Sequence, residues 1–359
     1  MDIQTVATNV KAYRSEKSLT QKKLAELAGI STQAIKQLES ENLAVSYETL
    51  RRISAVLGVQ LADLLRSPQT LRPVLFRSMK KLKNRSVILS VSGRWLDNYE
   101  FLEEELDCCQ DFKLKNIVFD CSPEELAKRV RKQLRIPADS PIDDIGLLLD
   151  RIGVKLFLYN KTLSDGFFGL SILGKNQVPA IVINTSNLLS SERQIFSAAH
   201  ELGHVLMHLD SFEQDEQNPK EELFEKDADS FAGYFLMPQN GFMKIWNDTS
   251  GMHWVDRILF VKHYFRVSYQ VVLHRLNELD KTNNYNKIFN FQYKRKYNDN
   301  LSGNKEPFKL NWKFVENRYS RLVCQALIKE KISVSRAAEM LGVSISEMLD
   351  IINSTPREK

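Results

Sequence analysis

The pentapeptide His-Glu-Leu-Gly-His at residues 200–204 contains the side chains of this chain that are best placed to do chemistry. His200 and His204 are four residues apart, so on a helix they share one face and can direct their imidazole nitrogens at one ion. Glu201 lies on the flank of that face, where it can take a proton from a water bound to the same ion. Two structural histidines on a core helix are the weaker alternative, because the chain has only 6 histidines. The spacing therefore indicates a zinc site suited to hydrolysis.

A zinc site of this kind requires a third protein ligand, and the downstream segment 221–238 offers one. Its apolar residues recur at helical spacing until a proline at 238 ends the pattern: Ala228, Phe231, Ala232, Phe235 and Leu236. Glu225 lies three residues before Ala228 and so belongs to the buried face of that helix, which makes it the expected third ligand. Asp229, one turn further on, is the alternative ligand. His208 is two turns from His200, about 12 Å along the axis, and is expected to support the ligands or to pack.

Three short segments before the metal helix have the composition of strands, namely 153–158, 166–173 and 180–184. They predict a small sheet beside the helix that carries the two histidines. An edge strand of such a sheet can pair with an extended peptide and hold it over the metal. A sheet that only supports the helix is the other interpretation. The remaining histidines, His253, His263 and His274, are expected on the surface or in packing.

At this point the chain resembles the ImmA/IrrE-type metallo-endopeptidases. The matching strings are RQIFSAAHELGHVLMH at 193–208 and EKDADSFAGYFLMP at 225–238, with weaker matches at 130–157, 165–171 and 178–185. The resemblance implies an α+β zincin-like domain over residues 121–280. It also implies that His200, His204 and Glu225 bind Zn²⁺ and that Glu201 is the catalytic base. The sequence departs from the family at Asp229, where family members often have asparagine.

The N-terminal residues 1–68 break into short amphipathic segments that predict five helices. Thr20 is the expected N-cap of one helix and Gly29 its end; a second helix follows at 32–41. This is the geometry of a helix-turn-helix. Two further helices are expected to bury apolar faces made of Tyr47, Leu50, Ile53, Leu57, Leu61, Leu64 and Leu65.

The string LTQKKLAELAGISTQAIKQLE at 19–39 resembles the XRE (Cro/cI-type) DNA-binding domain. The resemblance implies that helix 32–41 enters the major groove of double-stranded DNA. Thr32, Gln33 and Lys36 would then face base edges and phosphate, and Gln21 would anchor the DNA backbone. A small helical protein-interaction module of the same shape is the alternative. Charge favours DNA, because residues 1–85 hold 15 Lys/Arg and 7 Asp/Glu, whereas the whole chain has a net charge of only +5.

Length, composition and cysteine pattern indicate the class of protein and its compartment. A length of 359 residues with 43% hydrophobic and 26% charged residues is typical of a globular protein with two or three domains. No segment resembles a signal peptide or a membrane span, and the 4 cysteines form no CxxC pattern, so a cytoplasmic protein with reduced thiols is expected.

Residues 69–120 are predicted to be a linker or helical connector, with a helix at 86–107. Residues 281–359 are predicted to be a C-terminal connector and helical module. Within this tail, the basic and aromatic segment 283–300 is interpreted as an exposed connector, with single-stranded nucleic-acid binding as the alternative. Residues 332–352 repeat the helix-turn-helix rhythm with an acidic face, and are expected to be a packing or partner module.

The sequence therefore predicts a multidomain, mainly α protein: a helix-turn-helix domain, a metallopeptidase domain with a small sheet, and a helical tail. We expect a homodimeric, cytoplasmic regulator that binds a DNA operator and cleaves a regulatory protein such as a repressor or toxin. No cofactor besides zinc is expected. In one alternative the peptidase-like domain is a non-catalytic sensor or partner-binding surface. In another the chain is a metal-stabilised interaction protein without a DNA role.

Overall fold

The computed structural model describes residues 3–17, 19–40, 46–59, 61–65, 85–160, 167–208, 221–301, 305–315 and 318–354. As expected, these are mainly helical, with a single three-stranded sheet among the described residues. Residues 69–84 of the predicted linker lie outside them. No helix in the described ranges has the length and apolar character needed to cross a membrane.

The elements follow one another along the chain in three groups. The first group comprises α1 (Ile3–Glu16), α2 (Gln21–Ala28), α3 (Thr32–Glu39), α4 (Tyr47–Leu57), α5 (Leu61–Leu65) and α6 (Arg85–Glu105). The second comprises α7 (Pro123–Gln133), α8 (Ile145–Arg151), β1 (Lys155–Tyr159), β2 (Gly169–Leu173), the short 3-10 helix η1 (Lys175–Gln177), β3 (Pro179–Asn184), α9 (Ser191–Met207) and α10 (Glu221–Leu236). The third comprises α11 (Gln239–Asp248), α12 (Trp254–Phe265), α13 (Tyr269–Leu279), α14 (Tyr285–Tyr297), α15 (Arg318–Ile328), α16 (Val334–Leu341) and α17 (Ile345–Ser354).

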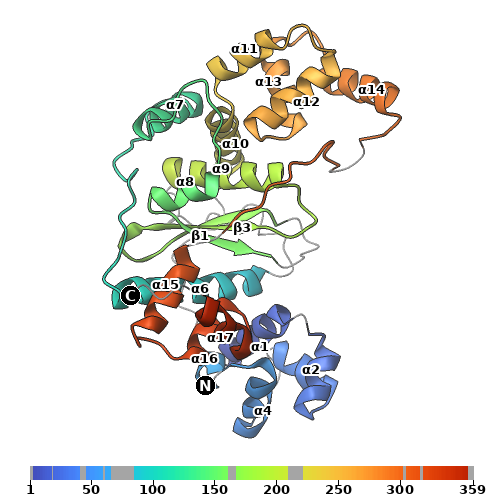
Figure 1. Cartoon of the computed structure of the whole chain (residues 1–359). Helices are drawn as coiled ribbons and strands as arrows, with labels where there is room; N and C mark the ends of the chain where they lie inside the picture. Colours follow the sequence, from blue (N-terminus) through green and yellow to red (C-terminus); the bar gives the residue numbers. More distant parts are fainter. Residues whose placement is uncertain are drawn as a thin grey trace.

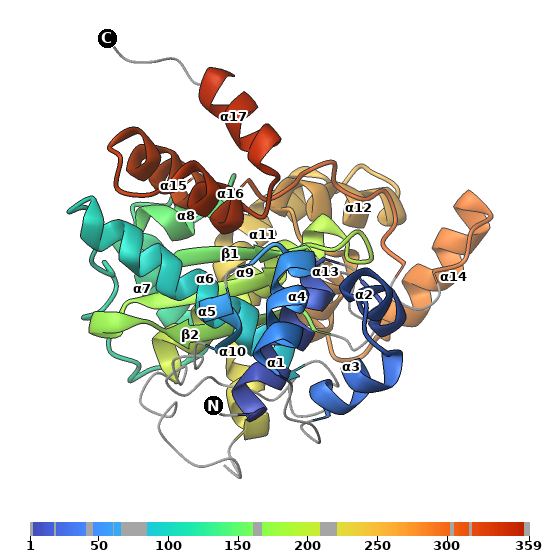
Figure 2. The ribbon, with the colours of Figure 1, turned by 90° about the horizontal axis from the view of Figure 1, so that it is seen from below.

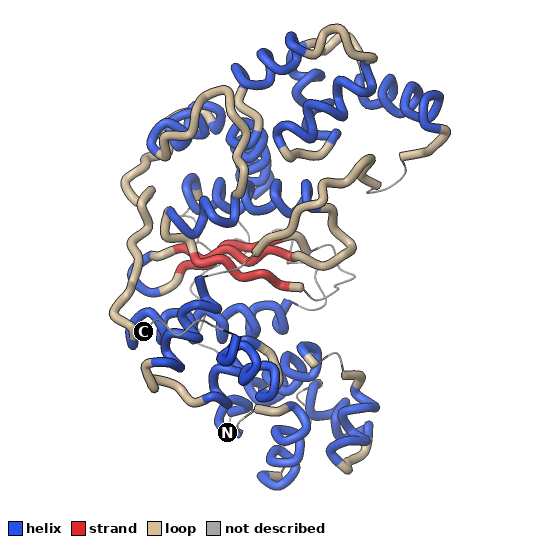
Figure 3. Tube along the Cα trace, in the orientation of Figure 1, coloured by secondary structure: helices blue, strands red, loops and turns tan. Residues whose placement is uncertain are grey.

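The elements form layers around the sheet (Figure 1). Helices α8 and α9 lie on one side of the sheet, and α10 to α14 lie beyond them. Helices α6 and α15 to α17 lie on the other side, where the N-terminal helices α1, α2 and α4 lie as well. The tube in Figure 3 shows the three strands enclosed between these helical layers. The sheet therefore separates α9, which carries the two motif histidines, from α6, the N-terminal helices and the C-terminal helices α15 to α17.

The three predicted strands are confirmed, in the order β1-β3-β2. Strand β3 pairs parallel with β1, Lys155 opposite Ala180, and antiparallel with β2, Leu170 opposite Val182. Because side chains alternate across a strand, Ala180 and Val182 join the core beneath α6, whereas Ile181 and Ile183 join the core around α9. Strand β3 is consequently buried on both faces, and β2 is left at an edge.

The N-terminal helices have the predicted caps. The Thr20 hydroxyl accepts a hydrogen bond from the Lys23 amide, and Gly29 ends α2 in the left-handed region at φ 65°. The next helix ends at Glu39 rather than at residue 41. Two of the predicted apolar face residues are wrong: Tyr47 is 67% exposed and Leu65 is 40% exposed. Each lies at a helix terminus, Tyr47 at the start of α4 and Leu65 at the end of α5, beyond the reach of the small core.

The helix-turn-helix region packs directly on α6. The buried Asn9 amide of α1 donates to the carbonyls of Asp63 and Leu64, and its Oδ1 accepts from the Ser90 hydroxyl of α6 at 3.2 Å. The Arg94 guanidinium lies 3.6 Å from the centre of the Tyr13 ring. Helix α1 is thus held to α6 by polar and cation–π contacts as well as by apolar burial.

Helix α6 is in turn fixed to the sheet and to the tail. Trp95 stacks on Phe157 of β1, with ring centres 4.9 Å apart. Glu103 forms buried ion pairs with Lys155 at 3.1 Å and with Arg318 of α15 at 2.6 Å. The N-terminal region, the sheet and the tail are therefore joined through one helix.

The tail agrees with its prediction in one part and differs in another. Gly342, at φ 68°, separates α16 from α17, and the small residues Ala337 and Ala338 of α16 are buried, so this repeat of the helix-turn-helix rhythm packs against the rest of the chain. In contrast, residues 283–300 are largely exposed, as we predicted, but they are not an irregular connector. They contain helix α14, which buries Phe289 and Tyr293. Two of the aromatic residues that suggested nucleic-acid binding, Phe289 and Tyr293, instead supply the buried face of this helix.

A buried cation fixes the start of α9. The Lys262 ammonium group of α12 has no exposed surface and lies 2.9 Å from a carboxylate oxygen of Glu192 and 2.9 Å from one of Glu306. It also donates to the carbonyls of Pro307 and Phe308. These contacts tie α9, α12 and the segment after α14 together around one charge.

Replacing Lys262 by methionine is expected to destabilise the fold by about 3–5 kcal/mol, because it leaves two carboxylates buried without a cation. The measurement is the shift in the urea unfolding midpoint relative to the wild type. Lys128→Met is the matched control: Lys128 pairs with Glu124 on an exposed helix face, where loss of the pair costs about 0.3–0.5 kcal/mol. Equal midpoints for the two variants would show that the buried cluster contributes no net stability.

Candidate metal centre and nucleic-acid interface

The two motif histidines lie on α9, which begins at a Ser190 cap and is buried along most of its length. Helix α10 crosses α9 closely at Gly203. A Cβ at Gly203 would lie 3.0 Å from the Phe231 ring and 3.3 Å from the Ala228 Cα, so any larger residue would push the two helices apart by a few tenths of an ångström or displace the ring. The close crossing brings the start of α10, and Glu225 with it, over the histidine face of α9.

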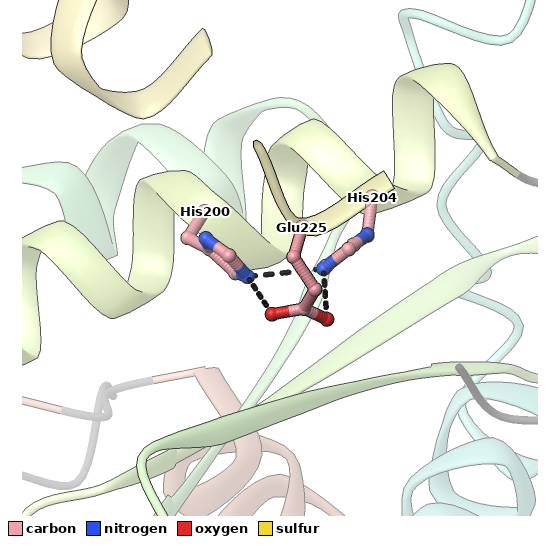
Figure 4. A group of neighbouring side chains, drawn as sticks. All are labelled: His200, His204 and Glu225. Carbon is pink, nitrogen blue, oxygen red and sulfur yellow. Dashed lines mark hydrogen bonds and ion pairs between the residues drawn. The ribbon is translucent and has the colours of Figure 1, made fainter. Parts of the chain in front are cut away.

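His200, His204 and Glu225 converge on one point (Figure 4). The Nε2 atoms of the two histidines are 3.0 Å apart. Carboxylate oxygens of Glu225 lie 3.8 Å from His200 Nε2 and 3.5 Å from His204 Nε2. Ligand atoms placed tetrahedrally about zinc at bond lengths near 2.0–2.1 Å are roughly 3.3 Å apart, so these separations and this N₂O donor set fit zinc.

Asp229 orients His200. Its carboxylate accepts a hydrogen bond from His200 Nδ1 at 2.8 Å, which leaves the Nε2 lone pair for a metal. Asp229 therefore supports the candidate ligand His200 through a hydrogen bond and is not itself one of the converging ligands. The alternative prediction, in which Asp229 is the third ligand, is wrong. Burial opposes protonation of His200, but the Asp229 hydrogen bond and the carboxylates of Glu201 and Glu225 outweigh it and raise the pKa of His200.

His208 has the corresponding position behind His204. Their Nδ1 atoms are 3.0 Å apart, so one ring donates and the other accepts. Burial, together with the neighbouring His204 and His200, lowers the pKa of His208 to about 3, which keeps its ring neutral and able to accept. This is the supporting position that the sequence predicted for His208.

Glu201 points from the same turn of α9 towards β2. The buried Ser171 hydroxyl donates to Glu201 Oε2 at 2.5 Å. At Gly169, on the same face of β2, a Cβ would lie 3.0 Å from Glu201 Cγ, so this glycine leaves room for the carboxylate. Burial raises the pKa of Glu201, against the opposing effects of the two histidines and the Ser171 hydrogen bond. The raised pKa of Glu201 and its position beside the two histidines both suit a base that must accept a proton near neutral pH.

His200, His204 and Glu225, the candidate metal-binding group, line a cavity of about 700 Å³. Strand β2, helices α9, α10 and α13 and the segment around Glu306 contribute to its walls. His274 lines it, with a 76% exposed side chain, whereas His253 is the N-cap of α12. Of the residues singled out from sequence, the structure thus brings His200, Glu201, His204 and Glu225 together in one cavity. Ser171 had no sequence signal beyond its place in a strand.

The second candidate site is the outer face of α3, which Figure 2 shows at the periphery of the molecule. Gln33 and Lys36 are exposed and Thr32 is half-buried. Gln21 is half-buried and donates to Glu39 at 2.8 Å. The same carboxylate receives two hydrogen bonds from Arg14, at 2.5 and 2.8 Å, which fixes α3 relative to α1 and α2. Sequence reasoning missed this Arg14–Glu39–Gln21 network, because no spacing rule connects its members.

Comparisons with known proteins identify two regions. Residues 10–64 match the helix-turn-helix family, and residues 153–277 match the IrrE N-terminal-like domain of peptidase family M78. The search of curated proteins found no match. Among solved structures, Bacillus thuringiensis PlcR in complex with the peptide PapR7 and DNA aligns over 98% of this chain and 96% of that chain, at 13% identity. Its TM-score of 0.17 is too low to indicate a shared overall fold.

Proposed function

We propose that this chain, which carries a helix-turn-helix domain and an IrrE N-terminal-like domain, is a DNA-binding regulator with a zinc-dependent endopeptidase centre. The observation that carries the proposal is the convergence of His200, His204 and Glu225 on one point, with the buried carboxylate of Glu201 beside it. Such a set of two imidazoles, one carboxylate and an adjacent general base is the arrangement that hydrolyses peptide bonds in zinc peptidases.

Zinc bound by the three side chains would polarise the scissile carbonyl and make a water molecule more acidic. Glu201 removes a proton from the attacking water and delivers it to the nitrogen of the leaving amine. Ser171 holds the carboxylate through its hydrogen bond to Oε2. Asp229 and His208 hold the two imidazole rings in the orientation that keeps their Nε2 atoms directed at the ion.

The edge of the sheet is the proposed peptide-binding surface. Among the described residues, β2 pairs only with β3, and Phe168 and Gly169 at its start line the cavity. An extended peptide can add to this edge as a further strand and place one of its bonds beside Glu201. A cavity bounded by an open strand edge suits cleavage within a chain. The proposed substrate is another regulatory protein, such as a repressor or toxin.

The proposed DNA partner follows from α3. Its exposed Gln33 and Lys36 side chains form no hydrogen bond or ion pair with other described residues, so both are available to bases and phosphates. We propose that the chain binds as a homodimer, because domains of this type read symmetric half-sites in pairs. A DNA operator also places the protein in the cytoplasm.

The direct test incubates zinc-loaded protein with the proteins encoded beside its gene and with a peptide library made from a proteome, and identifies new chain ends by mass spectrometry. Cleavage by the wild type and not by Glu201→Gln supports the proposal. Zinc-loaded protein that cleaves none of these substrates would contradict it and favour a non-catalytic sensor or partner-binding surface.

For DNA, duplexes are first selected from a random pool with the wild-type protein. Gln33→Ala is expected to weaken binding to the selected duplex by about 5- to 150-fold, the equivalent of about 1–3 kcal/mol for one base contact. Lys36→Ala is expected to lower the salt dependence by about one phosphate contact. Lys128→Ala, remote from α3, is the control. Unchanged affinity and salt dependence in both α3 variants would overturn the assignment of this face.

A further inference from the structure

We propose that Arg193 is a specificity-determining residue that binds a carboxylate of the substrate, on the side of the scissile bond that leaves as the amine. The inference rests on the proposed peptidase function and concerns the same cavity. The carboxylate can belong to an acidic side chain or to the end of the substrate chain, since a guanidinium binds both in the same way.

Arg193 shares the metal-binding face of α9. It precedes His200 by seven residues, two helical turns, so both side chains leave the helix in nearly the same direction about 10 Å apart. Both line the cavity. The guanidinium lies over the Phe168 ring, with its central carbon 4.0 Å from the ring centre. This stacking fixes the plane of the guanidinium and leaves its N–H groups at the edges free to donate.

Within the described residues, the half-buried guanidinium of Arg193 forms no hydrogen bond or ion pair. The Asp229 carboxylate attracts its charge from a distance, but that carboxylate is hydrogen-bonded to His200. The other cations of the cavity wall have carboxylate partners: Lys226 pairs with Glu222 at 3.3 Å, Arg275 with Glu278 at 3.5 Å and Lys305 with Asp299 at 2.5 Å. Burial of an arginine without a partner is unfavourable. A carboxylate entering the cavity would supply the missing bidentate partner.

The position of Arg193 along β2 determines which part of a substrate it reaches. Phe168, the residue before β2, contacts Arg193, whereas Ser171, three residues later, contacts Glu201. A peptide added antiparallel to β2 therefore runs from Glu201 towards Arg193 in its N-to-C direction. Paired strands advance together, so the three residues that separate Phe168 from Ser171, about 10 Å at roughly 3.4 Å per residue, correspond to about three residues of the peptide. Arg193 thus meets the second or third residue after the scissile bond.

The test measures binding rather than turnover. Peptide hydroxamates, whose hydroxamate binds zinc in place of the scissile bond, carry Asp, Asn or Lys at the second or third following position and an amidated end. A further Asn peptide has a free terminal carboxylate. Affinities for zinc-loaded wild type, Arg193→Gln, Arg193→Glu and the matched control Lys305→Gln are measured by calorimetry. Acetohydroxamate, which has no peptide, reports the metal centre alone.

The wild type and Lys305→Gln are expected to bind at least one carboxylate peptide about 10-fold or more tightly than the amidated Asn peptide. Arg193→Gln is expected to lose this preference and Arg193→Glu to prefer Lys, with acetohydroxamate affinity unchanged. The Asp and free-end peptides show which carboxylate is read. If the wild type binds the carboxylate peptides no more tightly than the amidated Asn peptide, or if the preference survives Arg193→Gln, the role of Arg193 is overturned. Neither result contradicts the metal centre. Failure of acetohydroxamate to bind overturns the metal centre, and the inference with it.

Discussion

Glu201→Gln is expected to reduce peptide hydrolysis by about 100- to 10,000-fold while zinc remains bound, because the substitution removes a general base and no ligand. Glutamine has nearly the same shape as glutamate, and its amide oxygen can still accept the Ser171 hydrogen bond that now reaches Oε2. The amide cannot take a proton from water. Rates are measured on a peptide cleaved by the wild type, with zinc content determined on the same samples.

Glu222→Gln is the matched control for this substitution. Glu222 lies on α10 near the metal-binding group, but its side chain is 68% exposed and pairs with Lys226. It is expected to keep wild-type hydrolysis. If Glu201→Gln retained activity within a few-fold of the wild type, Glu201 would not be the base, and the arrangement of Ser171 and Gly169 around it would need another explanation.

Much of the candidate metal centre could be predicted from sequence because its residues lie on two helices with readable periodicity. The four-residue spacing of His200 and His204 fixes their common face, and the apolar pattern of 228–236 places Glu225 on the buried side of α10. The three strands were readable for the same reason, since each is an apolar run between turn residues.

The supporting contacts could not be predicted in this way. Ser171 meets Glu201 because β2 lies under α9, and Arg14 meets Glu39 because α1 and α3 pack together. Neither pair has a sequence spacing that a periodicity rule could detect. The same holds for α6, whose Glu103 reaches both Lys155 and Arg318. Helix α14 in segment 283–300 was missed because the many Asn, Lys and Arg residues obscured the spacing of Phe289 and Tyr293, its two buried residues.

The mode of attachment of the helix-turn-helix region is the main structural finding that sequence did not indicate. The Asn9–Ser90 hydrogen bond and the Arg94–Tyr13 contact hold α1 on α6, whose other side packs on the sheet. Glu201 contacts the opposite face of that sheet through Ser171. The proposed DNA-binding and hydrolytic sites are consequently parts of one packed structure, joined through α6 and β2.

Zinc binding by His200, His204 and Glu225 is the property on which the proposed function most depends. Loss of a residue that hydrogen-bonds to a metal ligand typically weakens metal affinity by roughly 10- to 100-fold. His204→Ala removes a ligand itself, so it is expected to weaken zinc affinity by more than that. The control is His274→Ala, which alters an exposed histidine of the same cavity outside the metal-binding group. Folding of each variant is checked by circular dichroism.

The measurement is zinc content per chain, by mass spectrometry of protein equilibrated with zinc and then dialysed against a weak chelator. We predict about one zinc per chain for the wild type and for His274→Ala, and close to none for folded His204→Ala, as expected for a single site with three protein ligands. A wild type that retains no zinc, or a His204→Ala variant that retains as much as the wild type, would contradict the proposed metal centre.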